Sequence, residues 1–180
     1  MYDIFTYANY LIAGYGISTI VFLVATAFVK RFKLIKNNYL MIANFLALIL
    51  GLTVAIITVI NYYKNYVNAV ENNLAFPAYR TQFFIAIFFT GLVPLLFSIK
   101  KFRKSLLITF VVIASLNWFV FYEQVYIWMT HLYRDYVPSS WSVEYSQSPI
   151  PYIAVSTVIY FGLVFTMASM RKSERLTERL

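Results

Sequence analysis

Residues 39–61, YLMIANFLALILGLTVAIITVIN, form a predominantly apolar stretch without a single charged side chain. A helix needs roughly 20 such residues to cross the hydrocarbon core of a bilayer. Four further runs resemble this one, and the five predicted spans cover residues 11–29, 39–61, 82–99, 105–130 and 151–170. None of the five shows the strict alternation of apolar and polar residues that marks a membrane β-strand. The sequence therefore predicts an all-α integral membrane protein, a bundle of about five transmembrane helices.

The overall composition supports the same class. Hydrophobic residues make up 61% of the 180 positions and charged residues 12%, against typical soluble values of about 45–50% and about 25%. Five glycines and five prolines leave little room for linkers or low-complexity tails. We expect residues 1–180 to form a single transmembrane helical domain.

The basic residues fall into three clusters, which predict the topology. Twelve of the fifteen lie between the first two runs, between the third and fourth, or after the fifth: Lys30, Arg31, Lys33, Lys36, Lys100, Lys101, Arg103, Lys104, Arg171, Lys172, Arg175 and Arg179. By the positive-inside rule, the N-terminus should be outside and the C-terminus cytoplasmic. Each cluster flanks an apolar helix, where cations hold orientation and meet anionic lipid head groups, so the net charge of +8 does not indicate nucleic-acid binding.

The chain contains no cysteine and one histidine, His131. These counts exclude a cysteine-ligated iron–sulfur cluster, a covalently attached c-type haem, a disulfide and a bis-histidine haem held within this chain. Glycine-rich nucleotide loops, the Gly-x-Ser-x-Gly elbow and the His-Glu-x-x-His motif are also absent from the sequence. The chain is therefore not expected to be a self-sufficient enzyme or to bind a metal or cofactor alone.

Proline and glycine inside the runs predict local packing features. Pro94 should kink the third helix. Gly51, Gly91 and Gly162 should allow close approach of neighbouring backbones.

The fourth run carries a predicted polar strip. At about 100° per residue, Asn117, Gln124 and His131 fall on one stripe of the helix, because they are spaced by sevens. Glu123 and Arg134 fall together on a neighbouring stripe. Such a face should point into a helix bundle or at another subunit, because facing lipid would be costly.

Two interpretations of this strip remain open. In the first, Glu123 titrates and the strip conducts protons or faces a quinone, with Asn117 and Gln124 as hydrogen-bond partners. In the second, a cation such as Arg134 neutralises Glu123, and the two amides hold helices together. The residues alone favour the second interpretation.

The stretch from Tyr122-Glu123 to THLYRDYVPSSW at 130–141 resembles the late helix and exit loop of the NrfD-like membrane subunits. This family includes the membrane subunits of polysulfide reductase and of bacterial alternative complex III. Its members carry a glutamate at the corresponding place, followed by Leu-His-Arg-Asp-(Phe/Tyr)-Leu-Pro-Ser-Ser-Trp. The residues matched here are Glu123, Arg134 and Asp135. Arg134, Asp135 and Trp141 are candidate ion-pair or interface residues.

The resemblance is partial. It continues more weakly through GLVPLLF at 91–97 and KKFR at 100–103, and the chain is similar to the C-terminal half of a family whose members usually have eight to ten helices. Tyr133 stands where the family histidine is expected, and Gln124 stands where an arginine is expected. No quinol-binding residue is carried over.

The resemblance implies a membrane subunit of a quinol-oxidising respiratory complex in the bacterial inner membrane. This chain would be a non-catalytic subunit that contributes helix packing and a proton-relevant carboxylate. Quinone or quinol would bind at an interface, and haem and iron–sulfur clusters would belong to partner subunits. The implied partners are a larger NrfD-like subunit, periplasmic haem or iron–sulfur subunits and a terminal oxidase. The alternatives are a non-redox structural or assembly subunit and a small transporter or channel component.

Overall fold

The computed structural model describes residues 2–71, 80–118 and 150–177, and side chains at 6–71, 83–118 and 150–171. The described elements are α1 (Tyr2–Phe28), α2 (Lys30–Glu71), α3 (Arg80–Ile87), the π-helix η1 (Phe88–Leu92), the 3₁₀ helices η2 (Pro94–Ser98) and η3 (Phe102–Lys104), a helix at Leu106–Trp118, and α5 (Ile150–Thr177). No strand occurs in these residues, which confirms an all-α chain over the described ranges.

Three of the described helices are long and apolar enough to cross a membrane, over Thr6–Phe28, Lys30–Glu71 and Ile150–Arg171. They contain the predicted runs 39–61 and 151–170 and all but the last residue of the run 11–29. Two further apolar helices, Phe83–Ser98 and Leu106–Trp118, are shorter, and the remainder of the run 105–130 lies outside the described residues. The count of five spans and the orientation of the termini stay predictions.

Helix α2 is longer than its apolar run at both ends. Its 42 residues correspond to about 63 Å at 1.5 Å per residue, roughly twice the thickness of a hydrocarbon core. Part of α2 must therefore lie outside any bilayer that it crosses.

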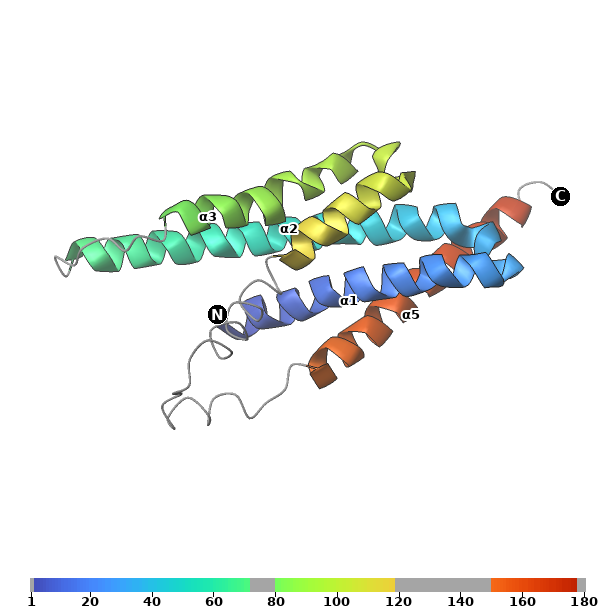
Figure 1. Cartoon of the computed structure of the whole chain (residues 1–180), viewed down its shortest axis with the longest axis horizontal. Coiled ribbons are helices and arrows are strands. Elements are labelled where there is room, and N and C mark those ends of the chain that lie inside the picture. The colour runs from blue at the N-terminus through green and yellow to red at the C-terminus, as the bar shows by residue number, and fades with distance from the viewer. Residues whose placement is uncertain (1, 72–79, 119–149, 178–180) are drawn as a thin grey trace, which may run out of the picture.

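The core lies between α1, α2 and α5, which pack side by side (Figure 1). Phe22 of α1 is fully buried and stacks on Tyr39 of α2, with the ring centroids 3.7 Å apart. Phe161 of α5 contacts both rings. Aromatic contacts thus join all three helices near one end of the bundle.

The helical geometry changes at Pro94, where a kink was predicted. Proline has no N–H group and its ring displaces the carbonyl of residue i−4. Before Pro94 the chain forms a π-turn, in which the Val93 N–H donates to the Phe88 carbonyl, and after it a 3₁₀ helix. Gly51 of α2 lies against this irregular segment, since a Cβ added there would come within 2.6 Å of the Thr90 carbonyl oxygen.

The other two predicted glycine contacts, at Gly91 and Gly162, have different outcomes. A Cβ at Gly91 would lie 3.2 Å from the Cβ of Ala55, so close packing is confirmed there. Within the described residues, a Cβ at Gly162 would meet no atom within 4 Å, so the predicted close approach does not occur there. The described part of the chain leaves this face of α5 open.

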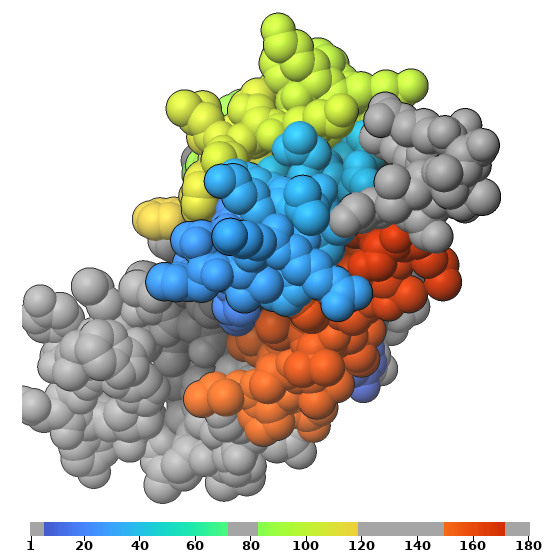
Figure 2. Space-filling view, turned by 90° about the vertical axis from the view of Figure 1, so that its right-hand side faces the viewer, coloured from blue at the N-terminus to red at the C-terminus, as the bar shows by residue number. Residues whose placement is uncertain are grey.

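The described parts of the three basic clusters lie at the same end of the bundle. In Figure 1 the start of α2, the turn after η2 and the C-terminal part of α5 all lie at the right. Figure 2 looks onto this end and shows α2 between that turn and α5. We call it the basic end.

Candidate functional site

A buried polar cluster joins four segments of the chain near the basic end. Its members are Tyr15 of α1, Asn44 of α2, the backbone of Arg103 in η3, and Thr109 of the following helix. We call it the Asn44 cluster. The side chains of Tyr15, Asn44 and Thr109 are completely buried.

The Asn44 amide makes three hydrogen bonds. Its Oδ1 accepts a bond of 2.8 Å from the Tyr15 hydroxyl. Its Nδ2 donates bonds of 2.7 Å to the Arg103 carbonyl oxygen and to Thr109 Oγ1. Thr109 Oγ1 donates in turn to the Ser105 carbonyl oxygen at 2.8 Å. Because an amide offers two N–H donors and one carbonyl acceptor, each polar atom of the Asn44 side chain is used.

Two further tyrosines face the interior beside this cluster. The Tyr160 hydroxyl of α5 donates a bond of 2.7 Å to the Ala43 carbonyl oxygen of α2. The Tyr39 hydroxyl lies beside the hydroxyls of Ser18 and Thr19. It is buried, as is the Thr19 hydroxyl, and neither makes a hydrogen bond in the described part of the chain.

Asn117 is the one residue of the predicted polar strip that the structure describes. It is half-buried on the Leu106–Trp118 helix, and its Nδ2 donates to the Ile113 carbonyl oxygen at 2.9 Å. It also lies against Gly16 of α1, where an added Cβ would be 2.6 Å from Nδ2. The stripe therefore points toward α1 at this position.

The other predicted site residues, Glu123, Gln124, His131, Arg134, Asp135 and Trp141, lie outside the described residues. Within the described ranges, no group of three or more histidine, cysteine, aspartate or glutamate side chains is placed to hold a metal ion.

Sequence reasoning missed the Asn44 cluster. Asn44 is an amide well inside the apolar run 39–61, and a polar side chain at that depth predicts a hydrogen-bonded contact with another helix. The partners of Asn44 could not be predicted in the same way, because Thr109 is 65 residues away along the chain. The sequence therefore indicated that Asn44 should form a hydrogen bond with another helix, but it did not indicate which residues are its partners.

The hydrogen bonds of the Asn44 cluster hold helices together. Its donors and acceptors are neutral amide, hydroxyl and carbonyl groups, and they hold α1, α2, η3 and the Leu106–Trp118 helix in fixed register. No protein-family model, curated protein or solved structure matches this chain.

Proposed function

We propose that the chain is a membrane subunit of a quinol-oxidising respiratory complex of the alternative complex III type, in the bacterial inner membrane. The N-terminus faces outward, and five helices cross the bilayer. The subunit contributes helix packing and carries a carboxylate, Glu123, at an interface where quinol is oxidised by partner subunits. Those partners hold the haem and iron–sulfur groups.

The observation that supports this proposal is the direction of Asn117. Asn117 lies against Gly16 of α1, and a helix that continues regularly repeats its face after seven residues. The seven-residue spacing predicts that Gln124 and His131 share this side of the helix, with Glu123 beside them. A polar strip on this side faces protein and is kept away from lipid, as the proposal requires.

The exposure of α5 supports a role in packing with another subunit or with lipid. In its most apolar 18-residue window, 17% of the residues are buried, against 44% in α1. Val158, Leu163 and Met167 are among the large apolar side chains that α5 leaves open. A helix this exposed within the chain is suited to cover part of a neighbouring subunit.

The test is to purify the intact assembly from native membranes through a tag on this chain. We expect haem-containing and iron–sulfur subunits to copurify. Glu123→Gln should lower quinol turnover on the order of 100-fold, because the loss of a proton-transfer group typically costs at least that. Glu71→Gln is the matched control, since Glu71 is an exposed carboxylate at the end of α2, and it should turn over quinol as the unmodified complex does.

The Asn44 cluster favours one alternative, a non-redox structural or assembly subunit. The polar atoms of the Asn44 side chain all form hydrogen bonds that hold helices together. Copurification with redox subunits and unchanged turnover in Glu123→Gln would select a structural subunit of the same complex. Copurification without any redox subunit would overturn the proposal. Solute flux into liposomes that contain this chain alone would instead identify a transporter or channel component.

A further inference from the structure

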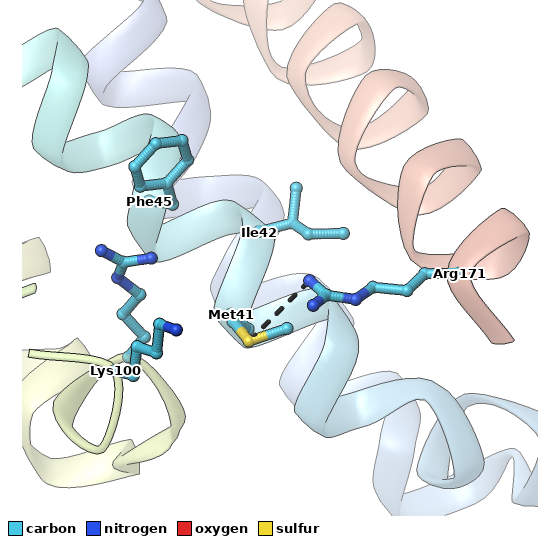
Figure 3. A pocket seen from close by; sticks show the side chains of 6 residues that line it. Met41, Ile42, Phe45, Lys100 and Arg171 are labelled. Carbon is cyan, nitrogen blue, oxygen red and sulfur yellow. Dashed lines mark hydrogen bonds between the residues drawn. The ribbon is translucent and has the colours of Figure 1, made fainter. Parts of the chain in front are cut away.

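A cavity of about 280 Å³ opens at the basic end of the bundle, between α2, the turn after η2 and the last turns of α5. Figure 3 shows the side chains that line it. They are Met41, Ile42, Phe45, Lys100, Arg103 and Arg171. We call it the basic cavity. One wall is apolar and the others carry three cations.

The positive charge of the basic cavity is not neutralised by the described side chains. Glu71 is the one carboxylate among them, and it stands 30 residues from Met41 along α2, about 45 Å at 1.5 Å per residue. Lys100 is exposed and makes neither a hydrogen bond nor an ion pair with the described part of the chain. Three cations around one cavity attract an anion.

Arg171 reaches across the mouth of the cavity. Its guanidinium leaves α5 and points at Met41 of α2, with Nη1 donating toward Sδ at 3.9 Å (Figure 3). A thioether sulfur is a weak acceptor, so this contact does little to balance a full positive charge. The guanidinium is therefore placed in the cavity with its stronger hydrogen-bonding capacity unused.

Arg103 forms a fixed side of the cavity. Its Nε donates to the Phe97 carbonyl oxygen and its Nη2 donates to the Ser98 carbonyl oxygen at 3.3 Å. The guanidinium also lies over the Phe45 ring, 4.7 Å from the centroid. Since a guanidinium has five N–H donors, three remain for a ligand, on a group whose position is already set by the protein.

The position of the cavity along the helices indicates what kind of anion would enter. Met41 is in the first turn of the apolar run 39–61, Lys100 directly follows the run 82–99, and Arg171 directly follows the run 151–170. The cations thus stand where the apolar surface ends, at the depth of lipid head groups. Basic pockets between helices at this depth suit the phosphate of an anionic lipid.

We infer that the basic cavity binds the phosphate group of an anionic phospholipid, with Lys100, Arg103 and Arg171 around the phosphate. The apolar wall of Met41, Ile42 and Phe45 receives the glycerol and the first methylenes of the acyl chains. The bound lipid bridges α2, the turn after η2 and α5, three segments that come together only in the folded chain. This inference does not depend on the proposed respiratory function.

The test uses the purified full-length chain in a non-ionic detergent. Native mass spectrometry counts dioctanoyl phosphatidylglycerol bound in competition with dioctanoyl phosphatidylcholine at equal concentration. We expect the unmodified chain to prefer phosphatidylglycerol. Lys100→Gln/Arg171→Gln should reduce that preference roughly 25-fold, since each cation placed directly against the bound phosphate contributes about 5-fold. Both side chains are exposed, so the variant should retain its helical circular dichroism.

The matched control is Lys30→Gln/Lys33→Gln, which removes the same charge at the same end but outside the cavity. It should keep the preference within about twofold, because diffuse attraction at the surface changes little. An equal loss in both double variants would overturn the inference, since it would show general attraction to a basic surface. Unchanged binding in Lys100→Gln/Arg171→Gln would overturn it as well.

Two further arms identify the source of the phosphate and the role of an acidic neighbour. Addition of millimolar inorganic phosphate should leave phosphatidylglycerol bound, and complete displacement would assign the cavity to free phosphate. Glu174 lies three residues after Arg171 in α5. Glu174→Gln removes a negative charge from this end of the chain and should bind phosphatidylglycerol at least as tightly as the unmodified chain. Weaker binding in that variant would overturn the inference.

Discussion

The Tyr15 hydroxyl of α1 donates a 2.8 Å hydrogen bond to Oδ1 of Asn44 on α2, and both side chains are fully buried. The same amide holds the Arg103 carbonyl and Thr109. One side chain of α2 therefore fixes the position of three other segments. Hydrogen bonds between transmembrane helices contribute about 0.6 kcal/mol on average and up to about 1.7 kcal/mol, so a residue that makes three of them should matter to stability.

The first prediction is that Asn44→Leu destabilises the bundle by about 2–4 kcal/mol. Leucine branches at the same carbon and has the same number of non-hydrogen side-chain atoms, but it leaves the Tyr15 hydroxyl without its acceptor and the Arg103 carbonyl and Thr109 hydroxyl without their donor. Unfolding in mixed micelles with increasing dodecyl sulfate, followed by circular dichroism, measures the change. Asn37→Leu is the control at an exposed position of α2, expected to stay within about 0.5 kcal/mol. Equal stability of the two variants would contradict a special role for Asn44.

The second prediction concerns two tyrosines for which the same substitution should have opposite effects. Tyr15→Phe removes a hydroxyl that is hydrogen-bonded and should cost about 1 kcal/mol. Tyr39→Phe removes a buried hydroxyl that lies beside the Ser18 and Thr19 hydroxyls but makes no hydrogen bond of ordinary geometry in the described part of the chain, and it should stabilise the bundle by about 1 kcal/mol. The Phe22 stacking partner of Tyr39 keeps its contact with the phenylalanine ring. The dodecyl sulfate titration used for Asn44→Leu measures whether each variant is more or less stable than the unmodified chain. A loss of stability in Tyr39→Phe would show that the Tyr39 hydroxyl is hydrogen-bonded in the membrane.

The third prediction compares two glycines in transmembrane helices. A Cβ at Gly14 would lie 2.8 Å from the backbone carbonyl carbon and oxygen of Ser156, and a backbone atom cannot move aside without separating α1 from α5. Gly14→Ala should therefore cost about 1–3 kcal/mol. Gly162→Ala places its methyl group in open space and should stabilise α5 by up to about 1 kcal/mol through the higher helix propensity of alanine.

The same two glycines provide a test for a partner of this chain. Gly162→Ala should be harmless in the isolated chain. A loss of copurifying subunits in that variant would place another helix against this face of α5. Retained copurification would mean that the open face at Gly162 meets lipid.

The sequence predicted the helical class well because hydropathy reports the solvent around a helix. The runs 39–61 and 151–170 lie inside α2 and α5, and Pro94 interrupts its helix for the local reason that it lacks an N–H group. Hydropathy does not report where a helix begins or ends. It therefore did not predict that α2 begins at Lys30, well before the first residue of the apolar run 39–61. Gly162 was misjudged because a glycine has the same appearance in sequence whether or not a neighbouring backbone lies beside it.

The sites were harder to predict than the helices. Asn117 could be assigned to a face from its spacing alone, since helical periodicity is local. Lys100 and Arg171 are 71 residues apart and meet at one cavity only through the packing of α5 on α2. Contacts of this kind depend on how helices pair, which a single sequence does not specify.

The fourth prediction concerns topology, and the absence of cysteine makes it directly measurable. Lys33 and Lys64 are 31 residues apart on α2, about 46 Å at 1.5 Å per residue, and both are exposed. This distance exceeds a hydrocarbon core of about 30 Å, and the positive-inside rule puts Lys33 in the cytoplasm. In intact spheroplasts a membrane-impermeant maleimide should label Lys64→Cys and should leave Lys33→Cys unlabelled until the membrane is permeabilised.

Lys101→Cys extends the experiment to the number of spans. Lys101 is exposed in the turn between η2 and η3, and it should share the protection of Lys33→Cys when the run 82–99 crosses the bilayer. Labelling of Lys101→Cys from outside would show that the irregular segment around Pro94 enters the membrane without crossing it. Labelling of Lys33→Cys from outside would show that the orientation is opposite to the predicted one, and the basic cavity would then face the outer leaflet.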